Sequence, residues 1–275
     1  MRAVPAGAAR RLLRLALLLI AVAGPARAQD LPPATGPGVE GVRLVEGWQQ
    51  RDGSRMAAIE IRLRPGWHTY WRIPGDSGIA PEIDWSGSRN LASVAYRWPR
   101  PEVFEQSGLT SFGHSGRLVL PVVLTPQDSG QPIEASARLD FGACNEICTP
   151  AAAEVSARLA PGAPPAGRAV IAAALATTPL EAGAAGVAGA ACRLVPGAAG
   201  PVLRADITFD ADAPRLGRAI FESAGRPVGL GTGAARGRTL RAEAPLMTGA
   251  TIDRSALRLT LVGDGQAVEV TGCAG

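Results

Sequence analysis

The chain has 275 residues with a formal net charge of +4, and every one of its 28 basic residues is arginine. Five of these arginines precede residue 29 with no acid among them, so the rest of the chain carries 4 − 5 = −1. A nearly neutral surface argues against nucleic acid as a partner.

The first residues have the pattern of an export signal. Four arginines stand ahead of an apolar run at residues 15–23, which is followed by the small-residue motif Ala26-Arg27-Ala28. This order predicts a cleaved signal peptide over residues 1–28 and delivery to the periplasm. A membrane anchor would need about 20 apolar residues, more than this run provides. No later segment reaches that length without charge, so we expect no transmembrane segment in the mature chain.

Short alternating segments separated by Gly and Pro turns begin near Val42. Ile59, Ile61 and Leu63 alternate with charged residues, which is the period of a strand with one buried face. Further strands are expected at residues 92–98, 117–124, 133–141 and 153–159. Strands of this length and spacing predict an all-β fold, with a first β-sandwich over residues 40–160.

Residues 161–186 change in character. They are rich in Pro, Gly and Ala, and residues 168–176 are compatible with a helix that ends before Pro179. We therefore expect a linker with one short helix. The β pattern then resumes, with strands expected at residues 192–195, 202–209, 219–222, 239–244 and 257–262. A second small β-sandwich over residues 187–275 is the simplest interpretation.

The chain contains four cysteines, Cys144, Cys148, Cys192 and Cys273. Four cysteines allow three pairings, and an exported protein can keep all of them as disulfides. Cys192 opens the second predicted sandwich and Cys273 nearly ends it, and the first and last strands of a sandwich often lie close together. The positions favour a structural disulfide between these two residues. The alternative is a second redox pair.

Cys144 and Cys148 would lie about 13 Å apart on a straight strand, too far to bond. They can meet if the strand turns after Gly142 and Pro150 redirects the chain. Closing such a small loop adds little stability, so the pair would contribute little as a structural disulfide and is a plausible redox switch. Spacing alone leaves the redox and the structural roles both open.

Several motifs together resemble a known family. They are residues 66–78 (GWHTYWRIPGDSG), 84–88 (DWSGS), 98–101 (WPRP), 118–122 (LVLPV) and the cysteine segment 141–150 (FGACNEICTP). In this order, from about residue 42 to 159, they look like the N-terminal periplasmic domain of the DsbD family, and most closely its ScsB-type branch. The second half and its two cysteines resemble the ScsB-type ectodomain more weakly.

The resemblance implies an immunoglobulin-like domain in which Cys144 and Cys148 relay reducing equivalents. A separate membrane-embedded thiol reductase would supply the electrons, and thioredoxin-like or disulfide-isomerase-like periplasmic proteins would receive them. The order of the family motif implies that Cys148 forms the mixed disulfide and Cys144 resolves it. The family also shields its cysteines with a cap loop, here residues 104–116, with Phe104 or Phe112 as the covering ring. An ordinary core role for these rings is the alternative.

Parts of the sequence are also compatible with other functions. Cys144 and Cys148 could bind Cu(I), which favours thiolates, although no Met or His is near them in sequence. The chain could also be an interaction module with two inert disulfides. His68 and His114 are expected as hydrogen-bonded or core residues rather than catalysts. A serine hydrolase would need Gly where Arg117 stands. We assign no cofactor and no metal site, and whether such a relay counts as an enzyme depends on its partners.

Overall fold

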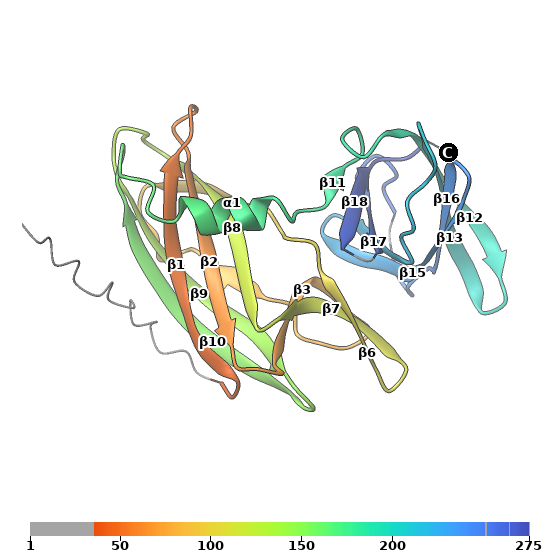
Figure 1. The fold of residues 1–275 in the computed structure, drawn as a ribbon, viewed down its shortest axis with the longest axis horizontal. Coiled ribbons are helices and arrows are strands. Elements are labelled where there is room, and N and C mark those ends of the chain that lie inside the picture. Colours follow the sequence, from red (N-terminus) through yellow and green to blue (C-terminus); the bar gives the residue numbers. More distant parts are fainter. Residues whose placement is uncertain (1–35, 251, 264, 275) are drawn as a thin grey trace, which may run out of the picture. The chain divides into compact units, whose positions relative to one another are not determined.

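The computed structural model describes residues 36–250, 252–263 and 265–274, and their strands form three sheets (Figure 1). The predicted signal peptide lies outside the described residues. Within the described ranges, no helix is both long and apolar enough to cross a bilayer. The predicted all-β, immunoglobulin-like fold class is confirmed.

The first sheet shows why alternation predicted its strands. It has the order β1 (Val39–Gln49), β2 (Arg55–Leu63), β8 (Arg117–Pro126) and β5 (Leu91–Tyr96). Ile59 and Ile61 of β2 enter the core between the sheets. Glu60, between them, is fully buried on the opposite face, where it forms ion pairs with arginines at positions 43, 62 and 117. Side chains on both faces of β2 are therefore buried.

The second sheet contains the segment that the family resemblance singled out. Its order is β10 (Cys148–Leu159), β9 (Ile133–Cys144), β3 (His68–Gly75), β7 (Leu109–Ser115) and β6 (Glu102–Gln106), and β4 (Glu82–Asp84) also pairs with β9. Residues 104–116 were expected to form a loop, but most of them belong to the hairpin β6–β7, which turns at Ser107 and Gly108 with positive φ.

The two sheets enclose one apolar core. Leu120 and Leu124 of β8 pack with Leu139 and Phe141 of β9, and all four are nearly inaccessible to solvent. The predicted helix is confirmed as α1 (Arg168–Leu175), which lies across the outer face of the first sheet (Figure 1). Its Ile171 packs against Val45, Met56 and Ala58 on that face. The helix thus buries apolar side chains that would otherwise face water.

The third sheet is formed by the C-terminal strands. Its order is β11 (Leu180–Glu181), β18 (Gln266–Thr271), β17 (Leu257–Gly263), β14 (Arg218–Ser223), β15 (Arg226–Arg236), β16 (Thr239–Pro245), β13 (Gly200–Phe209) and β12 (Val187–Gly197). Ala191 of β12 bridges to Ala274 after β18. The disulfide between Cys192 and Cys273 joins the same two places, with 5.6 Å between the Cα atoms. The end strand β12 is therefore tied to the segment that follows β18, which is next to the other end of the strand order.

Side chains of the second sheet contact the third. Arg72 of β3 forms ion pairs with Glu222 of β14 and Glu269 of β18. Phe112 is almost fully buried in a cluster that contains Ile220 and Val262. This ring, one of the two candidates for the covering ring, is thus packed against the third sheet.

Removing the Cys192–Cys273 disulfide with the double substitution Cys192→Ala/Cys273→Ala should lower the stability of the chain. The disulfide spans 81 residues, so the chain-entropy model gives a loss of about 4 kcal/mol. Denaturant unfolding at constant protein concentration measures this loss. An unchanged unfolding midpoint would show that the disulfide does not hold the third sheet together.

Candidate functional site

Cys144 and Cys148 occupy the end of a β-hairpin. Cys144 is the last residue of β9 and Cys148 the first residue of β10, and the two lie opposite each other in register. Their Cα atoms are 4.2 Å apart and their sulfurs form a disulfide. The turn is at residues 145–147, later than expected, because β9 continues through Gly142 and pairs with His68 and Thr69 of β3.

The two cysteines differ in exposure. Cys144 is fully buried, whereas Cys148 is exposed at the start of β10. Asn145, Glu146 and Ile147, which join them, are also exposed. The disulfide is therefore open to solvent on the Cys148 side and covered on the Cys144 side.

Tyr70 lies against both sulfurs. Its hydroxyl oxygen is 2.6 Å from Sγ of Cys144 and 2.7 Å from Sγ of Cys148. A disulfide sulfur carries no hydrogen, so the hydroxyl must donate. Burial raises the pKa of Tyr70, which keeps the phenol protonated at neutral pH. The disulfide thus has a neutral hydrogen-bond donor within reach of either sulfur.

Two glycines allow the Tyr70 ring to take this position. A Cβ at Gly142 would lie 2.9 Å from ring carbons of Tyr70, and a Cβ at Gly78 would lie 2.3 Å from the ring. Gly78 also has φ +127°, a conformation that favours glycine. The Thr69 hydroxyl donates to the Gly142 carbonyl at 2.8 Å and ties β3 to β9 beside the ring. Tyr70 is held by backbone on two sides.

An aromatic stack adjoins Tyr70. His68 lies opposite Cys144 in register, and its ring contacts Tyr70 edge-on with 5.5 Å between centroids. Phe104 of β6 stacks on His68 at 4.3 Å. Burial lowers the pKa of His68. The negative charge of the Glu102 carboxylate acts in the opposite direction but does not cancel this effect. Of the two candidate rings, the structure brings Phe104 to the site and places Phe112 elsewhere.

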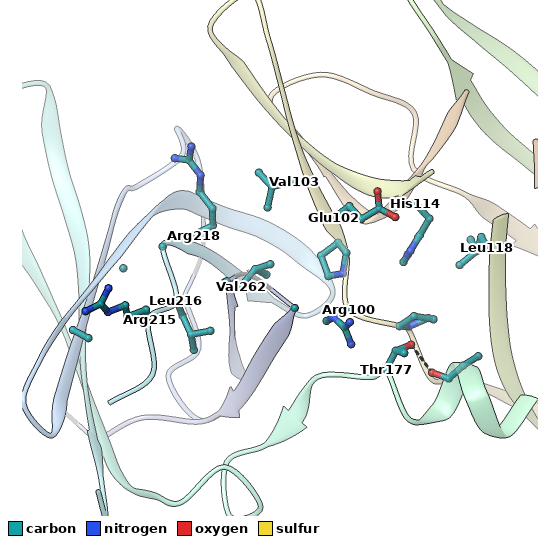
Figure 2. Close-up of a pocket in the computed structure, with 18 of the residues that line it drawn as sticks. Arg100, Glu102, Val103, His114, Leu118, Thr177, Arg215, Leu216, Arg218 and Val262 are labelled. Atoms are coloured by element: carbon teal, nitrogen blue, oxygen red, sulfur yellow. Dashed lines mark hydrogen bonds between the residues drawn. The ribbon is translucent and has the colours of Figure 1, made fainter. Parts of the chain in front are cut away.

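A large open cavity lies apart from the cysteines. Its lining includes Arg100, His114, Leu118, Arg215 and Val262, and no cysteine contributes to it (Figure 2). His114 is only 6% exposed, and its Nε2 has no hydrogen-bond partner within the described part of the chain. Burial lowers the pKa of His114 to about 4, and the charge of Glu102 offsets this only in part.

The pKa of His114 should make the folded chain sensitive to acid. Because the folded pKa lies below the ordinary value, unfolding takes up a proton, so the stabilisation is complete above about pH 6.5 and is lost as pH falls towards 4. The loss at pH 4 is about 3 kcal/mol. His114→Gln should remove this part of the pH dependence in denaturant unfolding. A variant with the same loss as the wild type would contradict the assignment.

Sequence reasoning did not identify Tyr70 as a site residue. Its contact with the sulfurs depends on the pairing of β3 with β9, which joins residues more than seventy positions apart. The same pairing brings His68 opposite Cys144, although no histidine is near the cysteines in sequence. Among the described residues, no group of three or more His, Cys, Asp and Glu side chains is arranged to hold a metal ion.

Comparisons with known proteins agree with the motifs. Residues 42–160 match the family model described as thiol:disulfide interchange protein DsbD, N-terminal. A search of curated proteins gives no match. The fold is similar to the crystal structure of the N-terminal periplasmic domain of ScsB from Proteus mirabilis, with a TM-score of 0.60 and 22% identity over 83% of this chain and 92% of that one. The predicted resemblance is confirmed: residues 42–160 match the model of the DsbD N-terminal domain, and the fold is similar to that of a periplasmic ScsB domain.

Proposed function

We propose that this chain is an exported thiol–disulfide interchange protein that relays reducing equivalents from a membrane-embedded thiol reductase to oxidised periplasmic thiol proteins. The observation that carries the proposal is the disulfide itself, in which an exposed Cys148 is joined to a buried Cys144 beneath the Tyr70 hydroxyl. A purely structural disulfide does not require one exposed and one buried sulfur. Thiol–disulfide exchange requires this difference, because a partner must reach one sulfur and the other must be shielded from it.

The proposed role assigns a function to each segment of the chain. Residues 1–28 are the cleaved signal peptide, residues 40–160 the redox domain, residues 161–186 the linker and residues 187–275 a second β-sandwich domain. The match of residues 42–160 to a DsbD N-terminal domain and the likeness of the fold to a periplasmic ScsB domain support this division. The Cys192–Cys273 disulfide is structural.

Reduction of the pair begins at Cys148. A donor thiolate attacks Sγ of Cys148, the Cys144–Cys148 bond breaks, and its electron pair stays on Sγ of Cys144. The Tyr70 hydroxyl, 2.6 Å away, stabilises the new thiolate by a charge-assisted hydrogen bond. The second donor thiolate then attacks the donor sulfur of the mixed disulfide and releases Cys148. The donor is oxidised to a disulfide, and two electrons have moved to the pair, whose thiolates take up protons from water.

Delivery reverses these steps. The Cys148 thiolate attacks a client disulfide and forms a mixed disulfide with one client sulfur. The Cys144 thiolate then attacks Sγ of Cys148, which restores the Cys144–Cys148 bond and releases the client as a dithiol. The stack of Phe104 on His68 covers the side of the site next to Tyr70, so a client approaches from the exposed loop at residues 145–147.

Transfer of thiols to a protein disulfide tests the proposal. The reduced chain is mixed with excess oxidised protein disulfide isomerase, quenched with acid, alkylated and analysed by mass spectrometry. We expect Cys144 and Cys148 to lose their thiols as two thiols appear on the isomerase, with Cys192 and Cys273 bonded throughout. Absence of transfer would contradict the relay. Copper titration of the reduced chain separates the relay from a Cu(I) site.

A further inference from the structure

The side chain of Ile147 is unusually exposed. It is 75% accessible, the highest value among the large apolar side chains found exposed in the described residues. It stands in the three-residue turn between β9 and β10, beside Asn145 and Glu146. Turns of this kind favour polar residues and glycine, and a β-branched apolar side chain contributes nothing to the turn itself. Neither packing nor local structure accounts for an isoleucine here.

The position of Ile147 relates it directly to the reacting sulfur. It precedes Cys148, so the two Cα atoms are about 3.8 Å apart. A mixed disulfide brings the Cα of the partner cysteine to about 5.5–6 Å from that of Cys148. A folded protein bound in this way contacts the turn that holds Ile147, because Ile147 and Cys148 are adjacent in the chain and both are exposed. A small dithiol can reach the sulfur without doing so.

A second exposed apolar side chain lies on the hairpin β6–β7. Leu109 is 47% exposed and pairs with Gln106, two residues from Phe104, so Leu109 and Phe104 share one face of the hairpin. Through Phe104, His68 and Tyr70, that face is connected to the sulfurs by direct ring and hydrogen-bond contacts. An apolar centre with charged residues at its edge is the usual composition of a protein interface.

We propose that Ile147 is the specificity-determining residue of the exchange, and that it inserts into an apolar depression beside the disulfide of a folded protein substrate. This inference rests on the proposed function and adds the chemical class of its client. Burying an isoleucine side chain contributes free energy only when the partner offers apolar surface. The neighbouring exposed Glu146 favours a partner whose depression is bordered by basic residues. Proteins that have a disulfide on a polar surface are poor substrates.

The test compares a protein disulfide with a small one. Reduced wild type, Ile147→Ser and Leu194→Ser are each mixed with oxidised protein disulfide isomerase and, separately, with oxidised glutathione, and initial rates of thiol loss are measured. Leu194 is a matched control because it is 50% exposed on β12 of the third sheet. For Ile147→Ser, we expect the ratio of the protein rate to the small-molecule rate to fall about tenfold. For Leu194→Ser, we expect the ratio to equal that of the wild type.

Three results would overturn the inference. The first is an unchanged ratio for Ile147→Ser, and the second is an equal fall of both rates, which would show a structural role in the hairpin. The third is conversion of a wild-type dimer to a monomer by Ile147→Ser, which would make a second copy of this chain the occupant. A wild type that reacts with oxidised glutathione but not with the isomerase contradicts the relay itself, which separates failure of the proposed function from failure of this inference.

Discussion

The variant Cys144→Ala is expected to accumulate as a mixed disulfide through Cys148. With Cys144 removed, an incoming disulfide still reacts with the exposed Cys148 thiolate, but no internal thiolate remains to attack Sγ of Cys148 and release the partner. Turnover of the relay is lost and the intermediate persists. Mass spectrometry after mixing with oxidised glutathione, whose leaving thiolate diffuses away and so does not reverse the reaction within the adduct, measures the mixed disulfide.

The matched control is Cys148→Ala. It leaves one thiol, at Cys144, which is fully buried in the folded chain and should form little adduct under the same conditions. Circular dichroism of both variants shows whether the fold is kept. The roles of the two cysteines would be reversed if Cys148→Ala gave the stable adduct and Cys144→Ala did not.

The variant Tyr70→Phe is expected to slow exchange by about 10- to 100-fold. The hydroxyl lies 2.6 Å from Sγ of Cys144, which carries the developing charge when the disulfide opens. A hydrogen bond to a charged group contributes about 1.5–3 kcal/mol, and each 1.36 kcal/mol is about tenfold in rate. The pKa of the Cys144 thiol should rise in the variant for the same reason. The rate of reduction by dithiothreitol and the pH dependence of alkylation measure both effects.

Tyr96→Phe is a suitable control for this substitution. The Tyr96 hydroxyl accepts a hydrogen bond from Nε1 of Trp85 at 2.9 Å, so both variants lose one hydrogen-bonded hydroxyl. Tyr96 is on β5 of the first sheet and has no contact with the sulfurs. Equal exchange rates in the two variants would show that Tyr70 fills space beside the disulfide and does not stabilise the thiolate.

Strands in which apolar residues alternate with polar ones could be predicted from the sequence. In β2, the alternation of Ile59, Ile61 and Leu63 with charged residues marks the inner face, and β9 and β10 follow the same rule. The strand β3 was missed because Thr69, Tyr70 and Trp71 are buried in succession. Two consecutive aromatic residues leave no alternation of apolar and polar residues to detect.

Of the candidate site, only the two cysteines could be predicted from the local sequence. The cysteines were identifiable because their spacing and surrounding motif lie within one short segment. Tyr70 and His68 reach them through the register of β3 against β9, and Phe104 arrives through a hairpin that looked like a loop. Nothing in local sequence encodes which distant strands pair, so the hydrogen-bond donor at the disulfide became visible only in the fold.

The reduction potential of the Cys144–Cys148 pair tests the central claim most directly. It is measured by glutathione titration with alkylation and mass spectrometry in the Cys192→Ala/Cys273→Ala background, so that one disulfide is observed. A reversible transition between about −120 and −270 mV, the range of proteins that exchange disulfides, is the result predicted for a relay. A potential below about −300 mV, or a pair that does not close again after reduction, would make the disulfide a staple and contradict the proposed function.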